Sequence, residues 1–168
     1  MRELLEDLLA IASAGKELKR KYRDIKEDPA ARYFVYVLKL SREGVIYVGS
    51  TDNVYARLLQ HVTLDGTAQV VKAYGPVERL MRLYSGCGAM DEKLVTLEMM
   101  AEHGHSTVRG AAFCKVEALP LEPPEVRTYQ GGSVQGRRMT RAQMDAIMEE
   151  VRGLAAGFDA VADASHNV

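Results

Sequence analysis

Apolar and polar positions follow two different periods along this chain, and each period predicts its own type of element. Residues 33–40 (YFVYVLKL) and 45–48 (VIYV) are short apolar runs rich in β-branched and aromatic side chains, and the polar stretch SREG joins them. This pattern predicts a β-hairpin. Residues 77–84 (VERLMRLY) alternate apolar and polar positions, which predicts a third strand.

Four other segments carry apolar residues at helical spacing, and they predict helices. These segments are residues 3–27, the residues that follow the possible caps Asp52 and Asn53, residues 90–103, and residues 140–155. The last of them opens with a capping box, Thr140 with Gln143 three positions on. We expect residues 62–75 to be irregular and residues 159–168 to be loose.

The order hairpin, helix, strand, helix predicts an α+β fold, with a small antiparallel sheet and helices packed on it. Extra helices are expected at both ends. We divide the chain into a helical extension (1–30), a central domain (31–114), a linker rich in proline and glycine (115–139), and a terminal helix with its tail (140–168).

Composition changes this picture little. The chain has 168 residues, of which 47% are hydrophobic and 27% charged, as in ordinary globular proteins. Its two cysteines lack the spacing of a zinc site. No run approaches the ~20 apolar residues that a membrane helix needs, so we expect no membrane partner and an intracellular location, cytoplasmic or nuclear. The net charge of -1 argues mildly against a nucleic-acid partner.

Four side chains of the hairpin and the following helix stand out by their spacing. Tyr36 lies in the first strand, and Tyr47 follows eleven residues later in the second. Arg57 comes ten residues after Tyr47, and His61 lies one helical turn beyond Arg57. Alternating strand positions and an i, i+4 helix pair can bring these groups to one pocket.

The stretch VYVLKLSREGVIYVGSTDNVYARLLQH resembles the GIY-YIG nuclease domain, the catalytic module of some homing endonucleases and of an excision-repair incision subunit. VYV, with Tyr36, matches the first signature, and YVG, with Tyr47 and Gly49, matches the second. The offsets to Arg57 and His61 also look like those of the family. The resemblance extends over about residues 33–113, because HGHSTVRGAAF looks like the closing segment of one branch of the family.

The resemblance implies a metal-dependent endonuclease that cleaves phosphodiester bonds of DNA, double-stranded or branched. It implies Tyr36 or Tyr47 as the general base. Arg57 would hold the phosphate and its developing charge, since a guanidinium matches phosphate oxygens. His61 would assist proton transfer or bind phosphate. The oligomeric state is left open.

The family also implies one divalent cation, Mg²⁺ or Mn²⁺, held by a glutamate on the later helix. If the apolar pair Met99 and Met100 aligns with the family, Thr96 takes the place of that glutamate. Glu92 lies one turn earlier on the same face, and Glu98 fits by residue type but points elsewhere. We favour Glu92 and keep Glu98 as the alternative.

Contacts to nucleic acid are expected from side chains around this centre. The residues are Gly49, Ser50, Lys72 and Arg109. Two other functions stay open at this point. The domain could bind nucleic acid without cutting it, or its terminal helices could make it a protein-interaction domain.

Overall fold

A computed structural model describes residues 33–166 of the chain, with side chains through Phe158. The predicted helix at residues 3–27 and the predicted extension at residues 1–30 lie outside the described residues. The described elements, in chain order, are β1 (Tyr33–Leu40), β2 (Ile46–Thr51), α2 (Val54–Thr63), α3 (Gln69–Tyr74), β3 (Val77–Cys87), α4 (Asp91–His103), β4 (Val108–Gly110), α5 (Pro124–Arg127), β5 (Arg137–Arg138) and α6 (Arg141–His166).

The strands form one five-stranded sheet in the order β4-β2-β1-β3-β5. β1 and β2 form the predicted antiparallel hairpin, in a register that sets Tyr36 opposite Gly49 and Leu38 opposite Tyr47. β3 pairs antiparallel with the other side of β1, whereas β4 runs parallel to β2. The α+β class is therefore confirmed, and the sheet is mixed rather than purely antiparallel.

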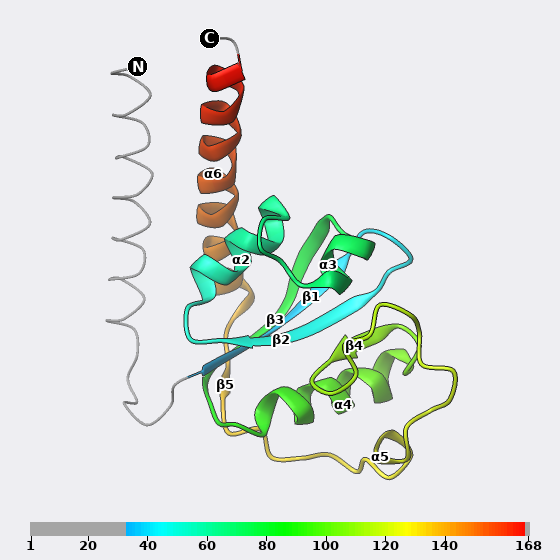
Figure 1. Cartoon of the computed structure of the whole chain (residues 1–168). Coiled ribbons are helices and arrows are strands. Elements are labelled where there is room, and N and C mark those ends of the chain that lie inside the picture. The colour runs from blue at the N-terminus through cyan, green and yellow to red at the C-terminus, as the bar shows by residue number, and fades with distance from the viewer. Residues whose placement is uncertain (1–32, 167–168) are drawn as a thin grey trace.

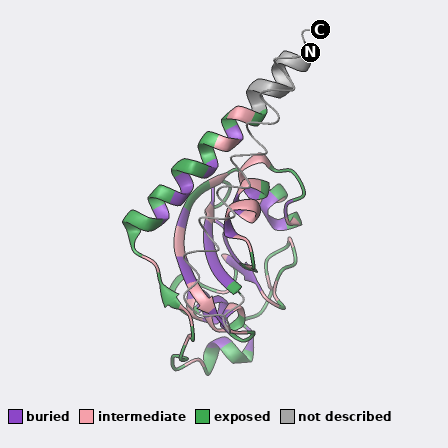
Figure 2. Ribbon diagram, turned by 90° about the vertical axis from the view of Figure 1, so that its left-hand side faces the viewer, coloured by how far each residue is buried: buried purple, intermediate pink, exposed green. Residues whose placement is uncertain are grey.

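Helices cover both faces of this sheet (Figure 1). Tyr36 and Leu38 of β1 belong to a core shared with α2, α3 and α6. Val35 and Val37 point the opposite way, into a second core shared with α4 and α5. Because both faces of β1 are buried, its sequence is an almost continuous apolar run instead of a polar and apolar alternation. Figure 2 shows these buried residues concentrated in the central strands.

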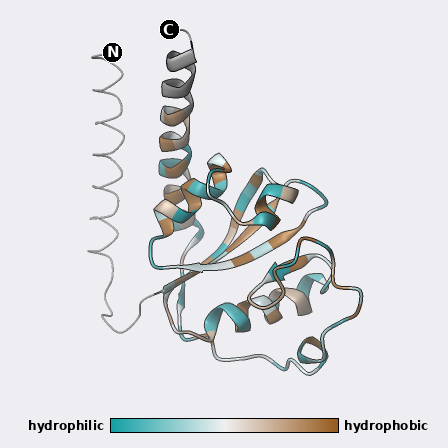
Figure 3. Ribbon diagram, in the orientation of Figure 1, coloured by the Kyte–Doolittle hydropathy of each residue, from teal (hydrophilic) through white to brown (hydrophobic). Residues whose placement is uncertain are grey.

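The C-terminal helix is longer than its sequence pattern predicts. α6 continues to His166, so residues 159–166, expected to be loose, are helical. The apolar stripe from Met144 to Ala155 packs against α2 and β3, and hydrophobic and hydrophilic residues alternate along this part of α6 in Figure 3. The prediction stopped at Ala155 because it followed the helical spacing of this apolar stripe.

Two stretches expected to be irregular contain regular structure. Residues 69–74, within the stretch predicted to be irregular, form α3, whose Val70 and Val71 are buried. The predicted linker at 115–139 carries α5, which packs on α4, and β5, which pairs with β3. In the described part of the chain, no helix combines the length and the apolar character that crossing a membrane requires.

Candidate active site

Three aromatic rings from three elements gather on the α2 side of the sheet. The ring centroid of Tyr36 lies 6.3 Å from that of Tyr47 and 5.3 Å from that of His61. The centroids of Tyr47 and His61 are 5.7 Å apart. Tyr47 pairs with Leu38, two residues along β1 from Tyr36, so the two phenols are diagonal neighbours on one face.

The close approach of these rings depends on Gly49, which faces Tyr36 across the hairpin. A Cβ atom at Gly49 would lie 2.5 Å from Cζ of Tyr36 and would overlap its hydroxyl. The ring of Tyr36 therefore occupies the space that a side chain at residue 49 would need. Packing against Tyr36 therefore explains why the YVG segment has a glycine at residue 49.

His61 lies behind Tyr36, away from solvent. Its Nε2 is 2.8 Å from the Tyr36 hydroxyl, and its Nδ1 is 2.5 Å from Oγ1 of Thr67. The His61 side chain is 0% exposed. Burial, and then the charge of Arg57, lowers the pKa of His61 to about 3. The imidazole is therefore neutral at pH 7 and orients Tyr36 from the inside of the domain.

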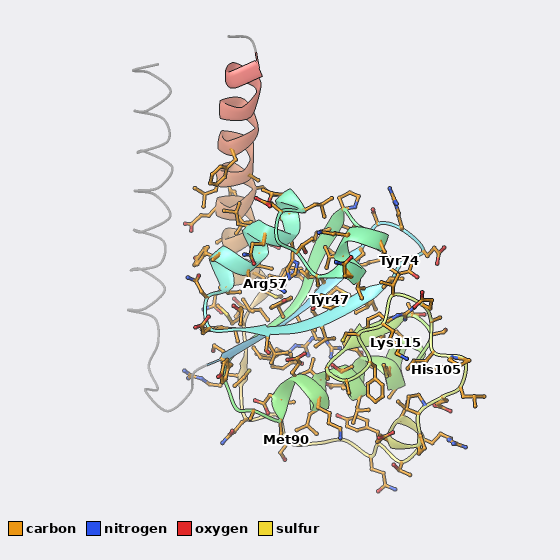
Figure 4. All side chains as sticks on the ribbon, viewed as in Figure 1. Tyr47, Arg57, Tyr74, Met90, His105 and Lys115 are labelled. Atoms are coloured by element: carbon orange, nitrogen blue, oxygen red, sulfur yellow. The ribbon has the colours of Figure 1, made fainter. Side chains whose placement is uncertain are left out.

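Arg57 lies on the open side of the same group, and Figure 4 shows it close to Tyr47 between α2 and β2. Its guanidinium interacts with the hydroxyls of both Tyr36 and Tyr47. Nη1 of Arg57 also donates to Oε1 of Gln60 at 2.9 Å and to the carbonyl of Gly66 at 3.3 Å. These bonds hold the cation at the two phenols.

Burial raises the pKa of Tyr36 and of Tyr47 above the ordinary tyrosine value, and Arg57 opposes this shift in both. Both phenols therefore keep their protons at neutral pH. Glu92 acts on both tyrosines as well, and its negative charge raises their pKa values further. The charges of Arg57 and Glu92 thus act in opposite directions on the same pair of phenols.

The carboxylates of α4 fall on different sides of the helix. Glu92 reaches β2, where its Oε2 accepts a hydrogen bond from Ser50 at 2.5 Å. Glu98 faces away and pairs with Arg82, at 3.7 Å from Nη1 to Oε2. Thr96 is 0% exposed and donates its hydroxyl to the carbonyl of Glu92 at 2.6 Å. Of the two glutamates predicted from the sequence, only Glu92 is beside the tyrosines.

A family model, described as the GIY-YIG catalytic domain, matches residues 32–94. This segment of the chain is therefore similar to the GIY-YIG catalytic domain. It spans β1 to the first turn of α4 and so contains the two tyrosines, the arginine, the histidine and Glu92. The family indicates a nuclease-type function with a nucleic acid as substrate, and GIY-YIG nucleases generally use divalent metal ions. A search of the curated proteins and a search of the solved structures found no match.

The structure places the predicted nucleic-acid contacts in different surroundings. Lys72 is exposed on α3, and Ser50 is exposed but bonded to Glu92. Gly49 is buried under Tyr36. Arg109 is 1% exposed, and its guanidinium donates to the carbonyls of Ser106, Val108, Lys115 and Val116. These contacts argue against the predicted role of Arg109 in binding nucleic acid, because its donors are used within the protein.

The donor set beside the tyrosines fits a hard divalent cation with few protein ligands. Glu92 is half-buried and offers carboxylate oxygens beside the phenols. Over the described residues, no three histidine, cysteine, aspartate or glutamate side chains gather as a metal site. Mg²⁺ commonly binds through one or two carboxylates, with water and substrate phosphate completing its shell. A single carboxylate such as Glu92 could therefore hold such a cation.

Two polar groups of this site were not predicted from the sequence. Thr67 is 8% exposed and holds the far nitrogen of His61. Its segment, DGTAQ, reads as a loop and gives no periodic signal. The backbone N–H of Ala111 donates to Oε1 of Glu92 at 3.1 Å. A backbone donor has no residue-type signature, so no sequence pattern could have found it.

Proposed function

We propose that this chain is a metal-dependent endonuclease that hydrolyses phosphodiester bonds of DNA. The observation that carries the proposal is the convergence of Tyr36, Tyr47, Arg57 and Glu92 at the end of the hairpin. A phosphodiester needs a proton acceptor for the attacking water, positive charge for the phosphate oxygens, and help for the leaving oxygen. Each of these needs has a candidate group at the site.

Arg57 binds the scissile phosphate in this proposal. Its guanidinium is half-buried and fixed by Gln60 and the carbonyl of Gly66, so it is preorganised for phosphate oxygens. The Tyr47 hydroxyl, which is protonated at neutral pH, donates a further hydrogen bond to the phosphate. Preorganised donors stabilise developing charge without having to reorient during the reaction.

Tyr36 and His61 position the attacking water. The Tyr36 hydroxyl donates to Nε2 of His61, 2.8 Å away, and its oxygen accepts a hydrogen bond from the water. In the tautomer that leaves Nε2 free to accept, the Nδ1–H of His61 donates to Thr67. Both phenols keep their protons and the buried imidazole stays neutral, so the proton of the water passes to a phosphate oxygen.

Glu92 would hold the cation, either Mg²⁺ or Mn²⁺. A divalent cation bound there would supply positive charge to the phosphate and to the departing oxygen. Lys72, exposed on α3, contributes to binding of the DNA backbone away from the reacting phosphate.

Nicking of supercoiled plasmid DNA with Mg²⁺ or Mn²⁺ tests the proposal. We expect the unmodified chain to nick, and Arg57→Ala, Tyr36→Phe and Glu92→Gln each to lower the rate by roughly 10²–10⁴-fold. Glu98→Gln is the matched control, since it alters a carboxylate on the other side of the same helix, and it should nick normally. If the unmodified chain binds DNA but never cuts it with either ion, a nucleic-acid-binding module replaces the nuclease. If it neither binds nor cuts, a protein-interaction domain replaces it.

A further inference from the structure

The carboxylate of Glu92 is held from two directions by groups outside its own helix. Ser50, on β2, donates its hydroxyl to Oε2 at 2.5 Å. The N–H of Ala111, directly after β4, donates to Oε1 at 3.1 Å. Each carboxylate oxygen therefore has one hydrogen bond and keeps a second lone pair. Two fixed donors on two oxygens define the plane of the carboxylate.

The turn that carries Ala111 is locked in place. Ala111 adopts a left-handed conformation with φ of 47°. Gly110 and Phe113 exchange two backbone hydrogen bonds, of 3.1 and 2.7 Å, around it. A Cβ at Gly110 would lie 2.7 Å from Oγ1 of Thr96 and 2.9 Å from Cβ of Val48, so only a glycine lets the turn sit this close to α4 and β2. A non-glycine residue in this region costs energy and persists where its surroundings impose it.

We propose that Ser50 and the Ala111 turn are positioning groups that set the orientation of the Glu92 carboxylate for its divalent cation. This inference rests on the proposed function, since it assigns a role toward the cation that Glu92 would hold. Partners outside the coordination shell orient ligands in metal sites generally, and their loss typically lowers metal affinity 10- to 100-fold. Ser50 is exposed, and among the described residues its hydroxyl bonds to Glu92 alone, so it can be changed without disturbing the core.

The inference also gives a role to Thr96, which takes the place of the family glutamate one turn after Glu92. Thr96 donates to the carbonyl of Glu92 and packs against Gly110, so it links the helix to the same turn. α4, β2 and the Ala111 turn thereby form one rigid frame around a single ligand. A site with one protein carboxylate depends on the orientation of that carboxylate more than a site with several ligands does.

The inference is tested by measuring Mn²⁺ binding to the full chain by electron paramagnetic resonance, in the absence of DNA. We expect Ser50→Ala to raise the dissociation constant for Mn²⁺ roughly 10-fold or more. Ser50→Thr keeps a hydroxyl and should restore affinity to within about threefold. Ser85→Ala, the same change on β3, is the matched control and should bind as the unmodified chain does. Equal melting temperatures for all three variants would show that a lost contact between strand and helix is not the cause.

The outcomes separate the two claims. If Ser50→Ala binds Mn²⁺ as tightly as the unmodified chain while Glu92→Gln does not bind it, Ser50 has no positioning role and the proposed function stands. If the unmodified chain does not bind Mn²⁺, or if Glu92→Gln binds it unchanged, the metal assignment of the proposed function fails and the inference fails with it.

Discussion

The ring of Tyr36 lies over the α-carbon of Gly49, its partner across the hairpin. This contact couples the two signature segments of the domain through sterics alone. We expect Gly49→Ala to lower the free energy of unfolding by about 1–3 kcal/mol, the usual cost of forcing an extra methyl group into a packed core. Urea unfolding measures it. Gly153→Ala, in α6 where a Cβ meets nothing within 4 Å, should leave stability equal or slightly higher.

A double-mutant cycle identifies the partner in this contact. In a Tyr36→Ala background the ring is gone, so Gly49→Ala should cost less than it does in the unmodified chain, by about 1 kcal/mol or more. Additive effects would show that the methyl group clashes with something other than Tyr36.

The buried imidazole of His61 predicts a loss of stability in acid. The folded-state pKa of about 3 lies below the ordinary value of 6.5, so the unfolded chain binds the proton more readily. Above about pH 6.5 His61 is neutral in both states and does not lower the free energy of unfolding. As the pH falls from there toward about 3, protonation of His61 in the unfolded chain lowers the free energy of unfolding progressively. At about pH 5 we expect the free energy of unfolding to have dropped by about 2 kcal/mol from this group.

His61→Gln isolates that contribution, because glutamine does not titrate. Other groups change stability with pH in both proteins, so the comparison is between the two slopes from about pH 7.5 to about pH 5. The slope should be smaller in the variant. Equal slopes would mean that His61 is already protonated when folded, or exposed to solvent.

Asp91, a buried carboxylate at the start of α4, should contribute strongly to stability. It is 3% exposed, and it accepts hydrogen bonds from the backbone N–H groups of Gly88, Gln135 and Gly136. Asp91→Ala would leave three donors unpaired, at a cost of about 3 kcal/mol in the free energy of unfolding. Thermal or urea unfolding measures this. Asp52→Ala, at an exposed aspartate, is the control and should change stability by less than about 0.5 kcal/mol.

Substitution of Arg109 should lower stability, whereas substitution of Lys72 should weaken DNA binding. Arg109→Met removes a buried guanidinium that bonds four carbonyls and lies 5.9 Å from the ring centroid of Tyr74, so we expect a loss of about 3 kcal/mol in stability. Lys72→Met should leave stability unchanged but weaken DNA binding. The slope of the logarithm of the binding constant against the logarithm of the salt concentration should become shallower by about one. If Arg109→Met folds stably but binds DNA more weakly, Arg109 contacts DNA after all.

Local pattern predicted the hairpin, because its two apolar runs and polar turn are contiguous in sequence. The same pattern predicted the segment that carries Tyr36, Tyr47, Arg57 and His61, and the structure brings these four together. Pattern could not assign the carboxylate on its own. Glu92 and Glu98 have the same chemistry, and only the packing of α4 on the sheet turns Glu92 toward Ser50 and Glu98 toward Arg82.

The misread parts share a physical cause. Arg109 looks like a nucleic-acid contact in sequence, because its bonds to backbone carbonyls depend on a fold that brings Val116 and Ser106 around it. β5 is two residues long, and it forms because Asp91 anchors the segment just before it. Contacts of that kind leave no period in the chain, so composition alone made residues 115–139 read as a linker.

The strands that follow α4, including the β5 segment anchored by Asp91, matter for the choice of a fragment to express. A fragment limited to residues 32–94 would end within α4 and would lack β4 and β5, the strands that cover β2 and β3. Both margins of the remaining three-stranded sheet would then expose unpaired backbone, which invites aggregation. The stretch that is recognisable by similarity is smaller than the smallest piece that can be expected to stay monodisperse by itself.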